Sequence, residues 1–476
     1  MRPALLPVIA AQQWRLLVRD RRLAVLGLSL LLALLAAAIA GAAVHGGREK
    51  ERRAAQAEEA RVWASQGPAN PHGAAHFGRY FFEPASPLAA IDPGLLPQLG
   101  NSLKIEAHAN NPARNRAIDG GTALDRFGGI SPATMLQLFA PLLVILSGFA
   151  AFSGERARGL LRQELAAGVA PAALMTGRLV GLSATAGLLL TVAALASLLA
   201  LAWNGGGPED YTALLWMMLG YGLYLFAFAA LTLAASAAFA SARTALVVLL
   251  GFWAMATLFV PRVAPTIAET LAPTLSGPAF EAAVTQEVRE GPSGHDPQDA
   301  RLERLRQATT RRYRVTRLED LPVDFNGIAL FAGEQLSTAI YRRHFAALYD
   351  GYDRQAAIER GFALLSPFEA IRPWSAALAQ SDQHAHRRFL EQADGFRYDL
   401  VQTLNRAIIH RRKGTEGPYL ADVAAITREA RFSPSPPRLR EALGRHWPDL
   451  ALLASWAGGA TLLAFAAAKR LARAGA

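Results

Sequence analysis

Six long apolar stretches alternate with polar segments along the chain. The hydrocarbon core of a bilayer is ~30 Å thick, and an α-helix needs about 20 apolar residues to cross it. Membrane-spanning helices are therefore predicted over residues 23–44, 134–152, 179–203, 211–240, 244–260 and 449–468. The buried helices of a soluble protein do not account for six such stretches in one chain. We expect an all-α polytopic membrane protein with six transmembrane helices.

The short loops predict how these spans are oriented. Lys and Arg cluster in residues 1–22, 153–178 and 469–476 and at Arg243, whereas residues 204–210 contain neither. Basic short loops favour the cytoplasmic side. Both termini are therefore expected in the cytoplasm, and two large insertions, 45–133 and 261–448, are expected in the periplasm. The first span exceeds the 7–15 apolar residues of a signal peptide, so it is read as an uncleaved helix.

Both insertions have patterns of folded, mainly α-helical segments. In the first insertion, residues 47–65 are charged and Ala-rich and predict a helix that continues the first span, and the segment SLKIEAHA alternates like a half-exposed strand. In the second insertion, helical spacing predicts helices over residues 278–290, 300–312, 333–360, 366–379 and 384–412. Two folded periplasmic domains are therefore expected. The second is expected to be a docking domain for a periplasmic partner, with a passive cap over the membrane helices as the alternative.

Composition excludes several classes of function. The chain has 476 residues, of which 52% are hydrophobic and 18% charged, and it has no cysteine. Disulfide frameworks and thiol chemistry are therefore excluded. The formal charge of +11 is dispersed, and no basic motif with interleaved aromatic residues predicts binding to nucleic acid. The spans contain almost no ionisable side chains, which disfavours a proton-driven transporter.

Two cytoplasmic segments have amphipathic patterns. Residues 1–22 predict a helix in the headgroup plane, with Trp14 as interfacial anchor and Arg15, Arg19 and Arg22 as a basic stripe. An ordinary basic flank that only fixes topology remains the alternative. The loop 153–178 combines charged residues with Leu160, Leu161 and Leu165 on one apolar face, which predicts an amphipathic helix over about residues 155–170.

The loop 153–178 resembles the corresponding loop in a known family of transporters. Its sequence, GERARGLLRQELAAGVAPAALMTGRLVG, is similar to the corresponding loop of type-2 ABC transporter permeases, which has a Glu, a Gly-Thr-Leu-like turn, a helix, a Pro and a basic residue. Glu155, Gly159-Leu160-Leu161, Pro171 and Arg178 occupy those places, with Leu160 where Thr is usual. The stretches PHGAAHFGRYFFEPASPLAAIDPG and SPATMLQLFAPLLVILSGF further resemble a branch with two large periplasmic insertions and no well-established substrate.

The resemblance implies a permease in the bacterial inner membrane, working as a homo- or heterodimer in an exporter or envelope-maturation system. The chain lacks a Walker A sequence, so a separate ATPase subunit is expected to bind ATP and Mg, and this chain is expected to be neither an enzyme nor a cofactor-binding protein. The expected contacts with the ATPase are Glu155, Arg156, Gly159, Leu160, Leu161, Leu165, Pro171 and Arg178. A solvated loop helix is the simpler interpretation. A membrane-anchored envelope sensor or assembly scaffold, which binds a partner without transport, is the alternative function.

Histidines are the weak candidates for site chemistry in the insertions. His72 and His76 are four residues apart, and His108 follows nearby in sequence, a set that could bind a metal ion. Pro71 and Gly73 argue against a regular helix there, so hydrogen-bonded packing is the favoured interpretation. His384 and His386 would point apart on a helix, next to two arginines that repel a cation.

Overall fold

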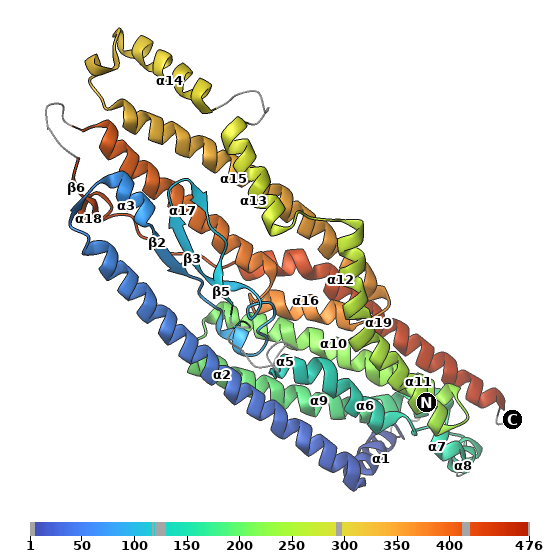
Figure 1. Ribbon diagram of the computed structural model, residues 1–476. Coiled ribbons are helices and arrows are strands. Elements are labelled where there is room, and N and C mark those ends of the chain that lie inside the picture. Colours follow the sequence, from blue (N-terminus) through green and yellow to red (C-terminus); the bar gives the residue numbers. More distant parts are fainter. Residues whose placement is uncertain are drawn as a thin grey trace.

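The structure is a computed structural model that describes residues 5–116, 119, 130–157, 159–291, 298–411 and 419–474. Most helices run along one long axis (Figure 1). Both described ends of the chain, the N-terminal helix and the loop between the second and third spans lie at one end of the molecule (Figure 1). The folded insertions lie at the other end.

The six predicted spans are confirmed as helices. Within the described residues, six helices are long and apolar enough to cross a membrane: Arg21–Ala64, Pro132–Glu155, Pro171–Trp203, Pro208–Ala238, Ala242–Leu271 and Leu439–Leu471. Each begins before its predicted apolar stretch, and the first, second, fifth and sixth also end after it, whereas the fourth ends at Ala238, two residues short of the prediction. The elements that form them are α2 (Arg21–Ala64), α5 (Pro132–Thr134), η3 (Met135–Phe139), α6 (Ala140–Gly148), α7 (Ser153–Ala157), α9 (Pro171–Trp203), α10 (Pro208–Ala238), α11 (Ala242–Ala254), η4 (Met255–Phe259), α12 (Val260–Leu271) and α19 (Leu439–Ala474).

Helix α10 is the centre of the bundle and packs against α6, α9 and α19. It begins at Pro208, where the carboxylate of Asp210 accepts a hydrogen bond of 2.8 Å from the backbone N–H of Gly207. Its inner face is fully buried and contains Tyr221, Tyr224 and Phe228. The Tyr224 hydroxyl donates 2.7 Å to the carbonyl of Gln137, in the π-helical turn η3, where a widened helix leaves carbonyls available to side chains.

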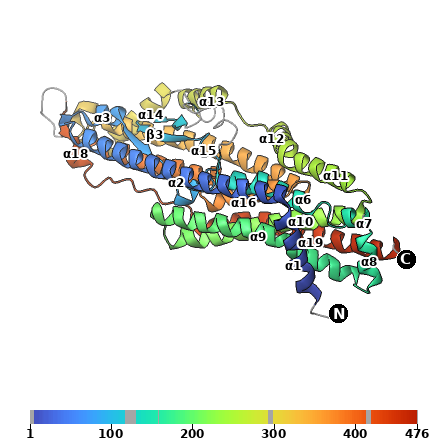
Figure 2. The ribbon, with the colours of Figure 1, turned by 90° about the horizontal axis from the view of Figure 1, so that it is seen from below.

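The N-terminal helix α1 (Leu5–Arg19) is separated from α2 by Asp20, which caps α2 by accepting from the backbone N–H of Arg22 at 2.9 Å. Figure 2 shows α1 turning away from the line of α2. Helix α1 packs closely on α9, because a Cβ at Gly177 would lie 2.5 Å from Ile9 and one at Gly181 would lie 2.7 Å from Gln13. Small residues four apart allow this approach between helices.

The first insertion adds a small antiparallel sheet to the helical fold. Strand β3 (Gly100–Glu106) overlaps the segment predicted to be extended, SLKIEAHA, but begins two residues earlier and ends three residues earlier. It pairs with β2 (Arg79–Phe82), β4 (Ala109–Asn110) and β5 (Arg114–Arg116). Arg79 is opposite Ile105 in this register. A second small sheet pairs β1 (Pro68–Ala69) with β6 (Ala421–Asp422), so it joins the first insertion to the second. Helix α3 (Pro71–Phe77) and the turn η1 (Pro87–Ala90) complete the insertion.

The second insertion contains the five helices that its sequence predicts. They are α13 (Gly277–Glu290), α14 (Gln298–Tyr313), α15 (Phe325–Gly361), α16 (Phe368–Leu378) and α17 (Gln383–Ile409), with the short α18 (Val423–Ile426) and the turns η5 (Leu318–Asp320) and η6 (Phe362–Leu364). Phe81, Leu103 and Ile105 of the first insertion share one buried cluster with Phe389 and Leu400 of α17. The two insertions, expected as separate domains, therefore pack around a common core.

Helix α16 belongs to the bundle, although its sequence lies in the middle of the second insertion. Trp374 is 1% exposed and its Nε1 donates 3.1 Å to the carbonyl of Trp216 on α10. Gly220 makes room for the indole, since a Cβ there would lie 2.4 Å from Trp374 Nε1. Ser375 is hydrogen-bonded to the Tyr221 hydroxyl at 2.9 Å. The insertions are thereby anchored in the core of the membrane helices.

Candidate functional site

The loop between the second and third spans folds into two short helices, α7 and α8 (Leu160–Ala166), where one helix over about residues 155–170 was predicted. The single-helix prediction is wrong because Gly159 has a φ of 78°, which ends one helix and caps the next. Gly168, with a φ of 81°, ends α8. Pro171 is in the first turn of α9, where a missing N–H costs nothing.

Arg178 joins α7, α8 and α9. Its guanidinium is 3% exposed and donates to the Glu155 carboxylate at 2.5 Å and to the Glu164 carboxylate at 2.6 Å. It also donates to the carbonyl of Ala151 at 2.6 Å and lies 4.3 Å from the ring centre of Phe152. Burial raises the pKa of Glu164, and the charge of Arg178 opposes that rise. A buried charge that is paired on several sides holds its partners in a fixed geometry.

Some of the predicted ATPase-contact residues are buried in the protein, and others are exposed on its surface. Glu155 is 7% exposed and faces Arg178, and Leu161 is 4% exposed in the main hydrophobic core. Leu165 is partly buried against the same core. Leu160 is 43% exposed, so it is the leucine of α8 that faces outward. The Arg156 side chain lies outside the described part of the chain, and the contact roles of all these residues remain predictions.

The N-terminal helix lies beside this loop. Gly177 and Gly181, which receive α1, flank Arg178 on α9, so α1, α8 and α9 meet around one turn of helix. Trp14 is half-buried, and Arg15, Arg19 and Arg22 are exposed. The prediction of one helix carrying all three arginines is wrong, because α1 ends at Arg19 and Asp20 caps α2, which carries Arg22. The interfacial role of these residues remains a prediction.

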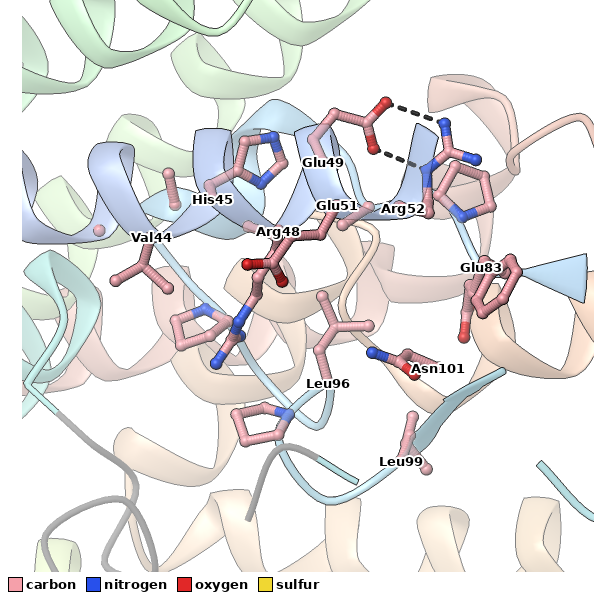
Figure 3. Close-up of a pocket in the computed structure, with 18 of the residues that line it drawn as sticks. Val44, His45, Arg48, Glu49, Glu51, Arg52, Glu83, Leu96, Leu99 and Asn101 are labelled. Carbon is pink, nitrogen blue, oxygen red and sulfur yellow. Dashed lines mark hydrogen bonds and ion pairs between the residues drawn. The ribbon is translucent and has the colours of Figure 1, made fainter. Parts of the chain in front are cut away.

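A cavity of about 690 Å³ opens between α2 and the segment that leads from β2 to β3 (Figure 3). Figure 3 shows Arg48 and Glu51 extending from α2 toward the loop that carries Leu96. Glu49 accepts hydrogen bonds of 2.7 and 2.9 Å from Arg52 in the wall of the cavity (Figure 3). Sequence analysis missed this cavity, because charged pairs three residues apart are typical of a solvated helix.

The weak histidine candidates come together in space. Pro71–Phe77 forms the regular helix α3, because Asn70 caps it by accepting from the backbone N–H groups of His72 and Gly73 at 2.9 and 3.0 Å. The objection to a helix from Pro71 and Gly73 is therefore wrong. His72 Nε2 and His76 Nε2 are 3.1 Å apart, and one nitrogen from each of His72, His76 and His108 lies within 4.8 Å of the others. By contrast, His386 is paired with Glu83 at 2.6 Å.

Burial and neighbouring groups shift the pKa values of His72 and Glu334 in this cluster. Burial, together with the neighbouring His76 and His108, lowers the pKa of His72 to about 4. Burial alone raises the pKa of Glu334, but hydrogen bonds from His108 and the charge of Arg397 outweigh it and hold that pKa at about 2.

Comparison with known families gives two matches. Residues 94–276 match the ABC-2 family transporter protein family, a range that contains the second to fifth spans and the α7–α8 loop. Residues 280–420 match a domain of unknown function, DUF3526, which covers most of the second insertion. None of the curated proteins matches the chain.

Proposed function

Since residues 94–276 make this chain a type-2 ABC transporter permease, we propose that it is the membrane subunit of an exporter or envelope-maturation transporter. A separate ATPase subunit, which holds ATP and Mg, docks on α7 and α8 from the cytoplasm. The insertions then lie in the periplasm of a bacterium, and the chain spans its inner membrane. A second permease protomer, identical or related, completes the transporter.

The observation that carries this proposal is the joint at Arg178. Three hydrogen bonds of 2.5–2.6 Å link its guanidinium to α7, to α8 and to the carbonyl of Ala151. Arg178 itself is within α9, so a displacement of α8 is transmitted to a span without passing through a flexible linker. Charge-assisted bonds in a buried setting are stiff enough for this role.

Helix α1 extends the same path. It contacts α9 through Gly177, directly before Arg178, and Gly181, about one turn of helix after it. Movement of α8 therefore tilts α9 and α1 together. In this proposal Leu160 fills an apolar groove of the ATPase, while Glu155 acts from inside by holding Arg178.

The cavity beside α2 is suited to bind the exported molecule at the external end of its path. It lies toward the insertions, where the external mouth of an exporter is expected, and its lining combines Val44, Leu96 and Ile130 with Arg48 and Glu51. Such a lining suits an amphipathic molecule, with apolar surface for its body and charged groups for its polar end.

Leu160→Asp tests the docking surface. We expect this variant to insert normally but to lose co-purification with its ABC ATPase and to lose the ATP hydrolysis that depends on the permease. A carboxylate pressed into an apolar groove costs several kcal/mol, whereas a charge exposed to water costs under about 0.5 kcal/mol.

Ala166→Asp is the matched control, because it adds the same charge to the same helix about 120° away around its axis. It should keep both ATPase binding and hydrolysis. Unchanged binding in Leu160→Asp would exclude the proposed surface. A chain that never associates with an ATPase, yet captures a periplasmic protein through its insertions, would instead be the sensor or scaffold.

A further inference from the structure

Three histidines from the first insertion meet at its contact with the second. His72 and His76 lie on α3, and His108 follows β3 in the turn to β4. Helices α15 and α17 of the second insertion pack behind them and contribute Glu334 and Asn405. Figure 1 places α3 at the end of the molecule away from α7 and α8, so this cluster is separate from the proposed ATPase contact.

The spacing of the ring nitrogens suits one small metal ion. Two nitrogens bound to a tetrahedral Zn²⁺ at ~2.0–2.1 Å stand about 3.3 Å apart, and His72 Nε2 and His76 Nε2 are 3.1 Å apart. The nitrogen of His108 lies within 4.8 Å of both. The His108 side chain is 34% exposed, so its ring has room to rotate the remaining distance.

Glu334 prepares His108 to act as a ligand. Its Oε2 accepts from the His108 backbone N–H at 2.9 Å and lies 3.1 Å from His108 Nδ1. Nδ1 therefore carries the ring proton, and Nε2 keeps a free lone pair. A carboxylate behind a ligating imidazole is the usual way in which proteins fix the tautomer and the ring orientation at a metal site.

This carboxylate is itself firmly held. Glu334 is fully buried and is bound by the Arg397 guanidinium, and Thr338 donates to it at 2.9 Å. His108 has a φ of 59°, a conformation uncommon for residues other than glycine. The chain thus keeps an unusual backbone turn at the residue that faces Glu334.

His72 has a similar support. Its Nδ1 and the Oδ1 of Asn405 are both buried, and neither has a hydrogen-bond partner among the described residues. Burial lowers the pKa of His72, and the side chain of Asn405 lies close enough to oppose that shift. A ring N–H and an amide oxygen that are both buried and unpaired can satisfy each other, and the other ring nitrogen of His72, Nε2, lies 3.1 Å from His76 Nε2.

We propose that His72, His76 and His108 bind one divalent transition-metal ion of the Zn²⁺ class, with Glu334 and Asn405 orienting two of the ligands. Three imidazoles select Zn²⁺, Cu²⁺ or Ni²⁺ over Mg²⁺ and Ca²⁺, which prefer oxygen ligands. The fourth coordination position is left for water or for a donor atom of a partner. Because both orienting residues belong to the second insertion, the ion ties the two insertions together at their contact.

The test uses the full chain in detergent, with any histidine tag removed and the protein freed of metal by a chelator. We expect one Zn²⁺ per chain by isothermal titration calorimetry and a rise in the unfolding temperature when Zn²⁺ is added. Mg²⁺ should produce neither effect. The absence of cysteine means that thiols cannot account for bound Zn²⁺.

His76→Ala is the main variant, because His76 is exposed and its loss leaves the packing of α3 intact. It should weaken Zn²⁺ binding by more than the about 10–100-fold expected when an orienting residue is lost, and it should abolish the rise in unfolding temperature. Asn405→Ala should weaken binding within that range. His384→Ala, a half-buried histidine elsewhere on α17, should bind Zn²⁺ like the unchanged chain.

Equal Zn²⁺ affinity in His76→Ala and the unchanged chain would overturn the proposal. So would a failure of the metal-free chain to bind Zn²⁺, because it would leave only a hydrogen bond between His72 and His76. Either result leaves the ATPase contact untouched, since that surface lies at the opposite end of the molecule (Figure 1).

Discussion

Each end of the molecule is organised around one buried arginine, but the partners of the two arginines lie at different distances along the chain. Arg178 gathers groups that are 14, 23 and 27 residues away in the chain. Arg397 binds Glu334, 63 residues away, and Glu334 in turn binds His108 across 226 residues. The first arginine fixes a local loop against its own span, whereas the second fixes one insertion against the other.

The two clusters also differ in how completely they exclude water. Glu334 is fully buried and Arg397 is 2% exposed. At the other end, the Glu164 side chain remains 28% exposed beside Arg178. A fully buried charge has no water to replace a lost partner, so we expect the Arg397 cluster to resist substitution less well. The Arg178 joint keeps access to solvent through Glu164, which suits the movement proposed for it.

Arg397→Met should have the largest effect on stability. It leaves the carboxylates of Glu334 and Asp394 buried without their shared partner, and breaking a buried pair in this way costs about 3–5 kcal/mol. The measurement is chemical or thermal unfolding of the purified full chain. Arg342→Ala is the control, because Arg342 also binds Asp394, at 2.7 Å, but is 51% exposed. Its loss should cost under about 1 kcal/mol, and equal costs for both would contradict the comparison.

Acidification should affect the two ends in opposite directions. The pKa of Glu334 is lowered from 4.5 to about 2, so its contribution to stability is present above pH 4.5 and is lost as pH falls toward 2. That contribution is about 3 kcal/mol. The pKa of Glu164 is raised, mainly by burial, so its contribution is present below pH 4.5 and is lost as pH rises through the raised value.

Hydrogen exchange at about pH 6 and about pH 4, corrected for intrinsic rates, measures this difference in the metal-free protein. Protection of α15 and α17 should fall on acidification, while that of α8 should hold or rise. Glu334→Gln should remove most of the pH dependence of α15 and α17. Parallel loss of protection at both ends would show that the two carboxylates do not titrate as described.

Arg178→Ala should have a smaller effect on stability and a large one on coupling. One of its acids is partly exposed, so we expect a cost of about 2–3 kcal/mol. Detached α7 and α8 should become sensitive to protease, and ATP hydrolysis should no longer depend on the permease. Arg178→Lys should not restore coupling, because an ammonium does not reproduce the planar fork that reaches two carboxylates and a carbonyl. Arg162→Ala, exposed on α8, should be neutral.

The same contrast explains what could be predicted from the sequence. The spans follow from local hydrophobicity, and the five helices of the second insertion follow from spacing along 3.6 residues per turn. The loop motif singled out Glu155 and Arg178 as candidate residues for the contact with the ATPase. Their mutual contact does not follow from the motif, because a sequence gives no direction for a side chain, and Glu155 was expected to face outward.

Contacts between residues far apart in the chain could not be predicted from the sequence. Nothing local distinguishes α16 from its neighbours, although Trp374 and Ser375 bind α10 in the membrane bundle. The histidine cluster depends on Asn70 capping α3 and on Glu334 reaching His108 from a distant helix. Pro71 at the first turn was read as a helix breaker, whereas it is a favoured residue at that position.

Cysteine labelling tests the orientation of the two ends and should have the smallest effect on the protein. A cysteine can be introduced without background because the chain has none. Ser65 and Ser433 are exposed at the insertion end and Gln163 is exposed on α8, so each substitution should cost under about 0.5 kcal/mol. An impermeant reagent applied to intact spheroplasts should label Ser65→Cys and Ser433→Cys but not Gln163→Cys until the membrane is broken. Labelling of Gln163→Cys in intact cells, with both serine variants protected, would show that the orientation is the reverse of the one predicted. The proposed metal-binding end would then lie in the cytoplasm.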